Sequence, residues 1–187
     1  MALSKVDAAN FLTGTIPSGN IATSSLAAAA TGKVLQVVSV TWDDATSSTS
    51  SDGTYAAITG ASASITPSAT SSKIFFQAMI TTGAQTYAQY IKIQRGGSDI
   101  AGALGAVTGS RKATTGYSVG GTSDNAEMQS TYISYLDSPS STSSLTYTLQ
   151  GSGRHTGGWT VNYPYTDTDA AYTGHSVSTI TLMEVGA

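Results

Sequence analysis

Apolar and polar residues alternate most regularly in a stretch near the middle of the chain. Within residues 73–81, two sets of side chains take alternate positions: Ile74, Phe76, Ala78 and Ile80 form one set, and Phe75, Gln77 and Met79 form the other. A period of two is that of a β-strand, because successive strand side chains point to opposite faces, whereas a helical face needs a spacing of three or four. The pattern therefore predicts a core strand over residues 73–81.

Similar strand signals recur along the chain, separated by turn residues. The predicted strands are residues 34–42, 55–65, 73–81, 88–95, 127–136, 145–150, 157–163 and 177–185, with a short one near 115–119 inside a long loop from 101 to 121. Pro67 and the small residues after it predict a turn over 67–72, and the Gly96-Gly97 pair predicts a hairpin turn. Strands without amphipathic helices predict an all-β fold, an antiparallel β-sandwich of jelly-roll-like type. Another Greek-key sandwich remains the alternative.

The first part of the chain has a different pattern. Its apolar residues are isolated among Gly, Ser and Thr, and they include Phe11, Leu12, Ile16, Pro17 and Ile21. Too few of them recur to form a core, so we expect this segment to order only by packing on something else. Residues 25–32 resemble one or two helical turns ended by a glycine. We therefore divide the chain into a segment of residues 1–31 and a head domain of residues 32–187, with a flexible tail as the alternative for the segment.

The composition narrows the classes of function. Only 10% of the residues are charged and the net charge is -3, so the chain has no basic stripe for phosphates and nucleic acid is not an expected partner. The absence of cysteine excludes disulfides and thiolate metal sites. No apolar run has the length of a signal peptide or of a membrane span, which predicts synthesis in a cytoplasm without export.

Residues that could carry catalysis are few and scattered. Only His155 and His175 could serve as histidine bases, and no Gly-x-Ser-x-Gly elbow or phosphate-binding loop occurs. The acidic residues lack the spacing of an EF-hand, and nothing in the sequence places Glu127 and Asp137 opposite each other as a glycosidase would require. We predict no catalytic residue, no metal site and no cofactor, and therefore a protein that is not an enzyme.

Aromatic residues gather near the end of the chain. Trp159, Tyr163, Tyr165 and Tyr172 lie in a Gly-rich stretch that also contains Asp167. Aromatic rings can stack on the apolar faces of sugars while carboxylates meet the hydroxyls, so this composition is typical of a saccharide-binding surface. The alternative is that these rings fill the core and a subunit interface.

Several short motifs occur in a fixed order along the chain: GKVLQVV at 32–38, ITPSATSSKI at 65–74, YLDSP at 135–139 and STITLMEV at 178–185. Together they resemble the fibre-type virion proteins of tailed bacteriophages, especially those of aquatic hosts. Two shorter phrases, LTGTIP at 12–17 and QRGGS at 94–98, are also similar to phrases in such proteins. The similarity extends over most of residues 32–187.

The resemblance implies a homotrimer that resides in the virion after synthesis in the host cytoplasm. It implies that Phe11, Leu12, Ile16, Pro17 and Ile21 contribute to attachment to other virion proteins, and that the β-sandwich faces outward toward a host-surface glycan. The chain departs from the family in having almost no room for a shaft, so a head fibre or capsid decoration protein is the first alternative. A carbohydrate-binding module is the second, and a tail-associated depolymerase the third.

Overall fold

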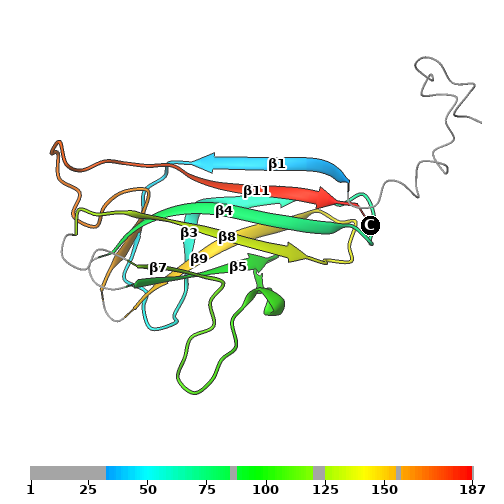
Figure 1. Cartoon of the computed structure of the whole chain (residues 1–187), viewed down its shortest axis with the longest axis horizontal. Coiled ribbons are helices and arrows are strands. Elements are labelled where there is room, and N and C mark those ends of the chain that lie inside the picture. Colours follow the sequence, from blue (N-terminus) through cyan, green and yellow to red (C-terminus); the bar gives the residue numbers. More distant parts are fainter. Residues whose placement is uncertain (1–32, 85–87, 120–124, 155–156, 187) are drawn as a thin grey trace, which may run out of the picture.

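The computed structural model describes residues 33–84, 88–119, 125–154 and 157–186. They form two antiparallel sheets that pack face to face, here called layer A and layer B (Figure 1). The long strands of layer A are, in spatial order, β1 (Val34–Trp42), β11 (Ser178–Val185), β4 (Lys73–Ala84) and β8 (Gln129–Asp137). Layer B contains the long strands β3 (Ala56–Ile65), β9 (Leu145–Gly153) and β5 (Ala88–Arg95), with the short strand β7 (Gly116–Val119) beside β5. The predicted all-β antiparallel sandwich is confirmed.

The order in which strands pair identifies the sandwich as a jelly roll. The first long strand pairs with the last, β1 with β11, and the pairing continues inward along the chain as β3 with β9, β4 with β8 and β5 with β7. A chain folded once into a long hairpin and then rolled into two sheets gives this order. Short strands β10 (Trp159–Val161) and β2 (Thr46–Ser48) extend layer A beyond the start of β11, and β6 (Ser98–Asp99) pairs with the end of β5.

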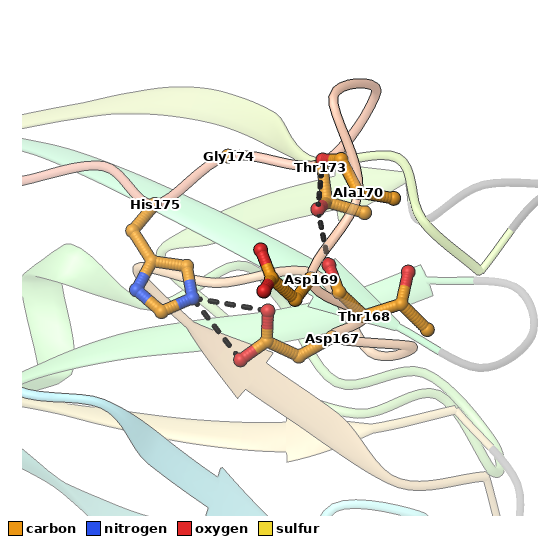
Figure 2. A pocket seen from close by; sticks show the side chains of 7 residues that line it. All are labelled: Asp167, Thr168, Asp169, Ala170, Thr173, Gly174 and His175. Atoms are coloured by element: carbon orange, nitrogen blue, oxygen red, sulfur yellow. Dashed lines mark hydrogen bonds and ion pairs between the residues drawn. The ribbon is translucent and has the colours of Figure 1, made fainter.

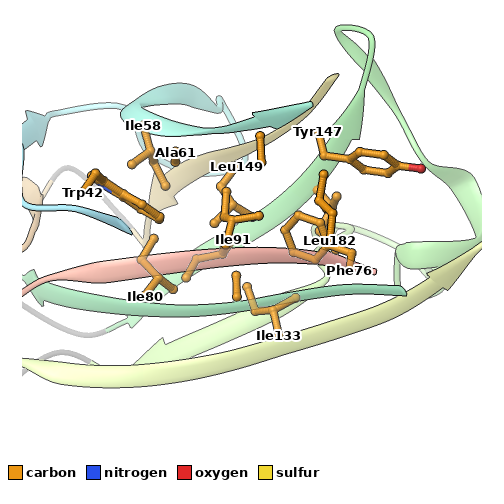
Figure 3. Packing of buried hydrophobic residues seen from close by; sticks show 14 of the residues in the cluster. Trp42, Ile58, Ala61, Phe76, Ile80, Ile91, Ile133, Tyr147, Leu149 and Leu182 are labelled. Atoms are coloured by element: carbon orange, nitrogen blue, oxygen red, sulfur yellow. The ribbon is translucent and has the colours of Figure 1, made fainter. Parts of the chain in front are cut away.

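The hydrophobic core fills the space between the layers (Figure 3). Ile74, Phe76, Ala78 and Ile80 are all buried, as the alternation of residues 73–81 predicted. The ring centroids of Phe76 in layer A and Tyr147 in layer B lie 6.1 Å apart. Burial of these side chains is the main favourable term in folding, at about 25 cal/mol per Å² of apolar surface.

Two glycines are required where tryptophan side chains pack on a neighbouring strand. Gly60 has φ of 78°, and a Cβ there would lie 2.8 Å from Trp42 Cδ1. Gly60 also lies within the irregular pairing of β3 with β9, between Ala57 and Ser62. At Gly151, a Cβ would lie 2.7 Å from the Trp159 ring. Glycine is therefore needed at both positions, since any side chain would push a buried ring out of the core.

The two ends of the sandwich differ, and we name them by their contents. The entry end holds Lys33, Gly186 and the turns at 66–72, 96–97 and 138–144; the loop end holds the connections 43–55, 125–128 and 162–177 (Figure 1). Because β1 leads away from the entry end and β11 returns to it, both ends of the described chain lie there. Residues 1–31, with the predicted attachment residues, lie outside the described residues.

A buried carboxylate fixes the 66–72 turn at the entry end. Glu184 is 1% exposed and accepts hydrogen bonds from the Ser68 backbone N–H at 2.7 Å, the Ser68 hydroxyl at 2.6 Å and Gln36 Nε2 at 2.7 Å. Burial raises the pKa of the Glu184 carboxyl, but the hydrogen bonds, including those from Ser68 and Gln36, outweigh it and lower the pKa to about 2. The Pro-Ser turn is thus held to β11 and β1 by an ionised side chain.

A second buried carboxylate joins the two layers. Asp137, at the end of β8, accepts a hydrogen bond from the Tyr147 hydroxyl at 2.6 Å and forms an ion pair with Arg95. Asp137 belongs to layer A, whereas Arg95 and Tyr147 belong to layer B. Burial raises the pKa of the Tyr147 hydroxyl and Asp137 raises it further, so this hydroxyl remains a donor. The ion pair that Asp137 makes with Arg95 is one that the sequence did not predict.

The observed strands agree with the predictions in position, with differences at short or polar elements. β1 and β5 have the predicted bounds, while β4 continues to Ala84 and β9 to Gly153. The short strand β2 was not predicted, because Thr46–Ser48 carries no apolar alternation. The long loop of residues 101–121 contains a 3-10 turn, η2 (Ala101–Ala103), and the short strand β7 near its predicted place. From residue 104 to 113 this loop extends away from the sandwich (Figure 1).

Candidate functional site at the loop end

The 162–177 connection begins at a residue with an unusual backbone conformation. Asn162 has φ of 70°, which is in the left-handed region that Asn tolerates better than most residues. Its side chain is buried; Nδ2 donates to the carbonyls of Trp42 at 3.1 Å and Asp44 at 3.2 Å, and Oδ1 accepts from the Ser178 hydroxyl at 2.6 Å. Ser178 Oγ in turn accepts from the Thr81 N–H. The Asn162 side chain therefore joins the end of β1 to the start of β11.

Trp159 lies beneath this region and belongs to the core. Its side chain is 0% exposed, and its indole N–H donates to the Ser50 carbonyl at 3.1 Å and to the Ser50 hydroxyl at 3.2 Å. The ring packs against Gly151 of β9. The hydrogen bonds hold the 48–51 segment over β10, so Trp159 acts as support for the loop end.

Tyr165 lines a shallow pocket above this support. The pocket is bounded by Ser47, Ser48, Thr49, Gly158, Trp159 and Tyr165. Tyr165 packs against Gly158, where a Cβ would lie 2.7 Å from the ring. Its backbone lies beside Gly83, and the neighbouring Thr160 hydroxyl donates to the Tyr163 carbonyl at 2.6 Å. A half-buried tyrosine between hydroxyl side chains is an arrangement that can offer both a ring face and polar edges to a ligand.

His175 and Asp167 form a second pocket in the same connection (Figure 2). His175 Nε2 lies 3.0 Å from both carboxylate oxygens of Asp167, and both side chains are exposed. The centroid of the Tyr163 ring lies 6.1 Å from the centroid of the His175 imidazole. Asp169 lines the same pocket. His175 also lines a neighbouring pocket with Asp43, Met79 and Ser130, which reaches the outer face of layer A.

The chemistry that this arrangement offers is polar recognition. Among the hydroxyls that line the His175 pocket, Thr173 Oγ1 donates to the backbone carbonyls of Thr168 at 2.5 Å and Ala170 at 2.9 Å. Thr173 therefore shapes the loop, and its proton is directed at the backbone. Asp167, Asp169 and His175 remain exposed as hydrogen-bonding groups for a hydroxyl-rich or charged ligand.

The five residues predicted for saccharide contact are divided by the structure between the core and the surface. Trp159 is buried, so its ring is not available for stacking as the molecule stands. Tyr163 and Tyr165 are half-buried, and Tyr172 is 75% exposed at the tip of the connection. Asp167 pairs with His175, which the sequence indicated only as one of the two histidines that could serve as a base. His155, the other histidine, lies outside the described residues.

Sequence reasoning missed the residues that position this surface. Asn162 is the clearest case, since an Asn that interrupts a strand between Val161 and Tyr163 is a signal for a left-handed turn. Within the ranges that the structure describes, no three His, Asp or Glu side chains are grouped so that they could hold a metal ion. No helix in those ranges is long and apolar enough to cross a membrane.

Comparison with known proteins adds no relative. No protein-family model matches the chain, and no curated protein is similar enough to count as a match. The function therefore has to be argued from the residues and the fold.

Proposed function

We propose that this chain is a structural protein of a virus particle, of the kind that tailed bacteriophages carry as short fibres. In this proposal residues 1–31 attach the protein to other virion proteins, through the isolated apolar residues between Phe11 and Ile21. The β-sandwich forms the head of a homotrimer. The loop end points away from the particle and contacts the host surface.

The observation that carries the proposal is that the chain enters the sandwich at one end and has its candidate site at the other. The chain enters at Lys33, and the 43–55 and 162–177 connections lie at the opposite end of strands that are eight to twelve residues long. At about 3.3 Å per residue, the two ends are roughly 25 to 40 Å apart. A head held through residues 1–31 would therefore present the 162–177 connection outward. The motif resemblance to phage fibre proteins supports the same orientation.

The test is the presence of the protein in particles. Virus particles from cells that produce the protein are purified on a density gradient, analysed by mass spectrometry and labelled with gold-coupled antibody against the head. We expect the chain in the particle band, with label on the tail or the head. Label spread evenly over the capsid would favour the alternative of a decoration protein. Absence of the chain from particles would overturn the proposal.

The attachment segment is tested by complementation. Particles are produced in cells that supply either the full chain or the chain lacking residues 1–31. We expect only the full chain to be incorporated. Incorporation of both would remove residues 1–31 from the proposal, while leaving the virion location in place.

Contact with a host glycan is a separate part of the proposal. The surface at the loop end combines Tyr163, Tyr165 and Tyr172 with the Asp167–His175 pair. Binding of labelled full-length protein to host cells should fall when Tyr165 and Tyr172 are replaced by alanine. Tyr117→Ala is the matched control, because Tyr117 is an exposed tyrosine on β7 of layer B. Equal binding by all variants would remove the glycan from the proposal.

A further inference from the structure

The outer face of layer A carries a row of apolar side chains that crosses all four long strands. Strand register aligns Val37 of β1 with Met183 of β11, Met183 with Phe75 of β4, and Phe75 with Leu136 of β8. Val37 is 56% exposed and Leu136 is 46% exposed, while Phe75 and Met183 between them are half-buried. We call these four residues the apolar row. Val34 and Val185, which pair directly, extend it toward the entry end.

Two more rows continue this face toward the loop end, whereas toward the entry end Val185 pairs with the exposed Lys73 of β4. The next row is polar and aligns Ser39, Thr181, Gln77 and Ser134, with the Ser39 and Thr181 hydroxyl oxygens 3.2 Å apart. The third aligns Thr41, Thr179, Met79 and Tyr132, and Tyr132 is 79% exposed. None of these positions in the three rows carries a charged side chain. The face therefore has an apolar band, a polar band and a mixed band.

The outer face of layer B is different. There, the Ser64 and Thr146 hydroxyl oxygens lie 2.8 Å apart across β3 and β9, and Lys92 of β5 forms an ion pair with Asp99 at 2.9 Å. The pKa of the Asp99 carboxyl is lowered by hydrogen bonds from Lys92 and Gln94. A sheet face exposed to water normally carries polar residues, as β3 and β9 of layer B do, although Tyr117 and Val119 of β7 are exposed beside them. The apolar row of layer A thus departs from the pattern of this Ser- and Thr-rich chain.

A second copy of the chain is the partner that this face fits. The three rows carry no charge, so they offer nothing to a strongly basic or acidic partner but can meet the same rows of other copies without like-charge repulsion. When three copies turn this face toward a common axis, their apolar bands can bury one another and their hydroxyl rows can exchange hydrogen bonds. The apolar row lies near the entry end, where the described part of the chain begins at Lys33.

We infer that copies of this chain associate through the outer face of layer A, with Val37, Phe75, Leu136 and Met183 at the centre of the contact. The inference rests on the proposed trimer of heads and names the surface on which it forms. With strands about 4.8 Å apart and alternate rows about 6.7 Å apart, the three rows span roughly 14 by 13 Å. The area of the three rows, roughly 180 Å², is smaller than the roughly 800 Å² per partner of a standard interface. One buried charge should therefore be enough to separate the copies.

The test compares native masses of the full chain and of single-lysine variants by light scattering. Val37→Lys and Leu136→Lys place a charge in the apolar row at positions that are exposed in one copy, so each copy should still fold. Ser62→Lys is the matched control, because Ser62 is exposed on β3 of layer B. We expect the full chain and Ser62→Lys at three times the 19.0 kDa of one chain, and both row variants at one chain mass.

The outcomes separate this inference from the proposed function. An oligomer that survives both row substitutions would overturn the inference and leave the trimer in place. A full chain that is monomeric would overturn the inference and the trimer together, while the particle analysis would still decide the virion location. Dissociation of Ser62→Lys as well would also overturn it, since the effect would not be specific to layer A.

Thiol labelling gives a second measurement that does not depend on dissociation. The chain has no cysteine, so Leu136→Cys and Ser62→Cys each introduce the only thiol. We expect maleimide to react with Cys at position 62 at the rate of an exposed thiol, and with Cys at position 136 much more slowly, rising on dilution. Equal rates at both positions at every dilution would overturn the inference.

Discussion

The entry end and the loop end of the sandwich are fixed by different kinds of interaction. At the entry end, the buried carboxylates of Glu184 and Asp137 hold the 66–72 turn and join the two layers. At the loop end, neutral groups such as Asn162 and Trp159 hold the base of the connections, and the His175–Asp167 pair is exposed. One end of this fold therefore depends on ionised groups, while the other keeps its charged side chains on the surface, where a ligand can reach them.

The largest expected effects test whether both ends rely equally on the core. Phe76→Ala, toward the entry end, and Trp159→Ala, at the loop end, should each lower the free energy of unfolding by about 3 to 5 kcal/mol, because each removes a fully buried aromatic ring. Denaturant unfolding measures both. Phe75→Ala is the control, since Phe75 lies on the opposite face of the same strand. A change within error for Phe76→Ala would mean that the two faces of β4 are assigned the wrong way round.

Acid should weaken the entry end first. The folded pKa of Glu184 is about 2, below its ordinary value of 4.5, so its contribution is complete above about pH 4.5 and is lost as the pH falls toward 2. At pH 7, Glu184→Gln should lower the free energy of unfolding by about 3 kcal/mol at most. The variant and the natural chain should converge near pH 2, as measured by unfolding at several pH values.

The control for this titration is an exposed carboxylate at the loop end. Asp169→Asn should change the free energy of unfolding by no more than about 0.5 kcal/mol. A pH-independent difference between Glu184→Gln and the natural chain would show that the ionised form of Glu184 is not what holds the turn.

The loop end should respond to loss of a neutral network without a dependence on pH. Asn162→Ala removes three side-chain hydrogen bonds and places alanine at a φ of 70°, which together should cost about 2 to 4 kcal/mol. Asn162→Gly relieves the backbone strain and should recover part of the loss. Unfolding at pH 4 and pH 7 measures both variants; equal stability of the alanine and glycine variants would exclude a backbone contribution.

The smallest effect is expected at the exposed His175–Asp167 contact. His175→Gln should change the free energy of unfolding by about 0.5 kcal/mol or less, because a polar contact between two exposed side chains contributes little. Thermal unfolding of this variant, beside Asp167→Asn, measures it. A loss above about 1 kcal/mol would place the pair among the interactions that fix the loop end and so remove the contrast between the ends.

The sequence predicted the strands better than it predicted what connects them. β1 and β5 have strong β-branched or alternating patterns over their whole length, and both were predicted with the observed bounds. β2 consists of three residues with hydroxyl side chains, and it is a strand because β10 pairs with it. Short-range pattern carries no information about such a strand, since tertiary pairing decides it.

The candidate site could be predicted only in part, for a related reason. The cluster of Tyr163, Tyr165, Asp167 and Tyr172 was visible because its members are neighbours in sequence. Trp159 belongs to the same stretch, but its burial depends on Ser50 and Gly151 from distant strands. Glu184 accepts a hydrogen bond from Ser68, which is 116 positions away in the sequence, and no local spacing predicts that contact. Contacts of this range follow from the rolled topology, which the sequence indicated only as a class.

The place of β11 in the sheet has a consequence for how the chain folds. It is the latest of the described strands in sequence, yet it lies between β1 and β4, and its register joins Val185 to Val34. During synthesis, β1 therefore cannot be joined to β4 in layer A until β11 has been made. Pairings of such long sequence separation make folding slow and leave apolar strand surface uncovered in the meantime. We expect this sandwich to fold in milliseconds to seconds, once β11 has been synthesised.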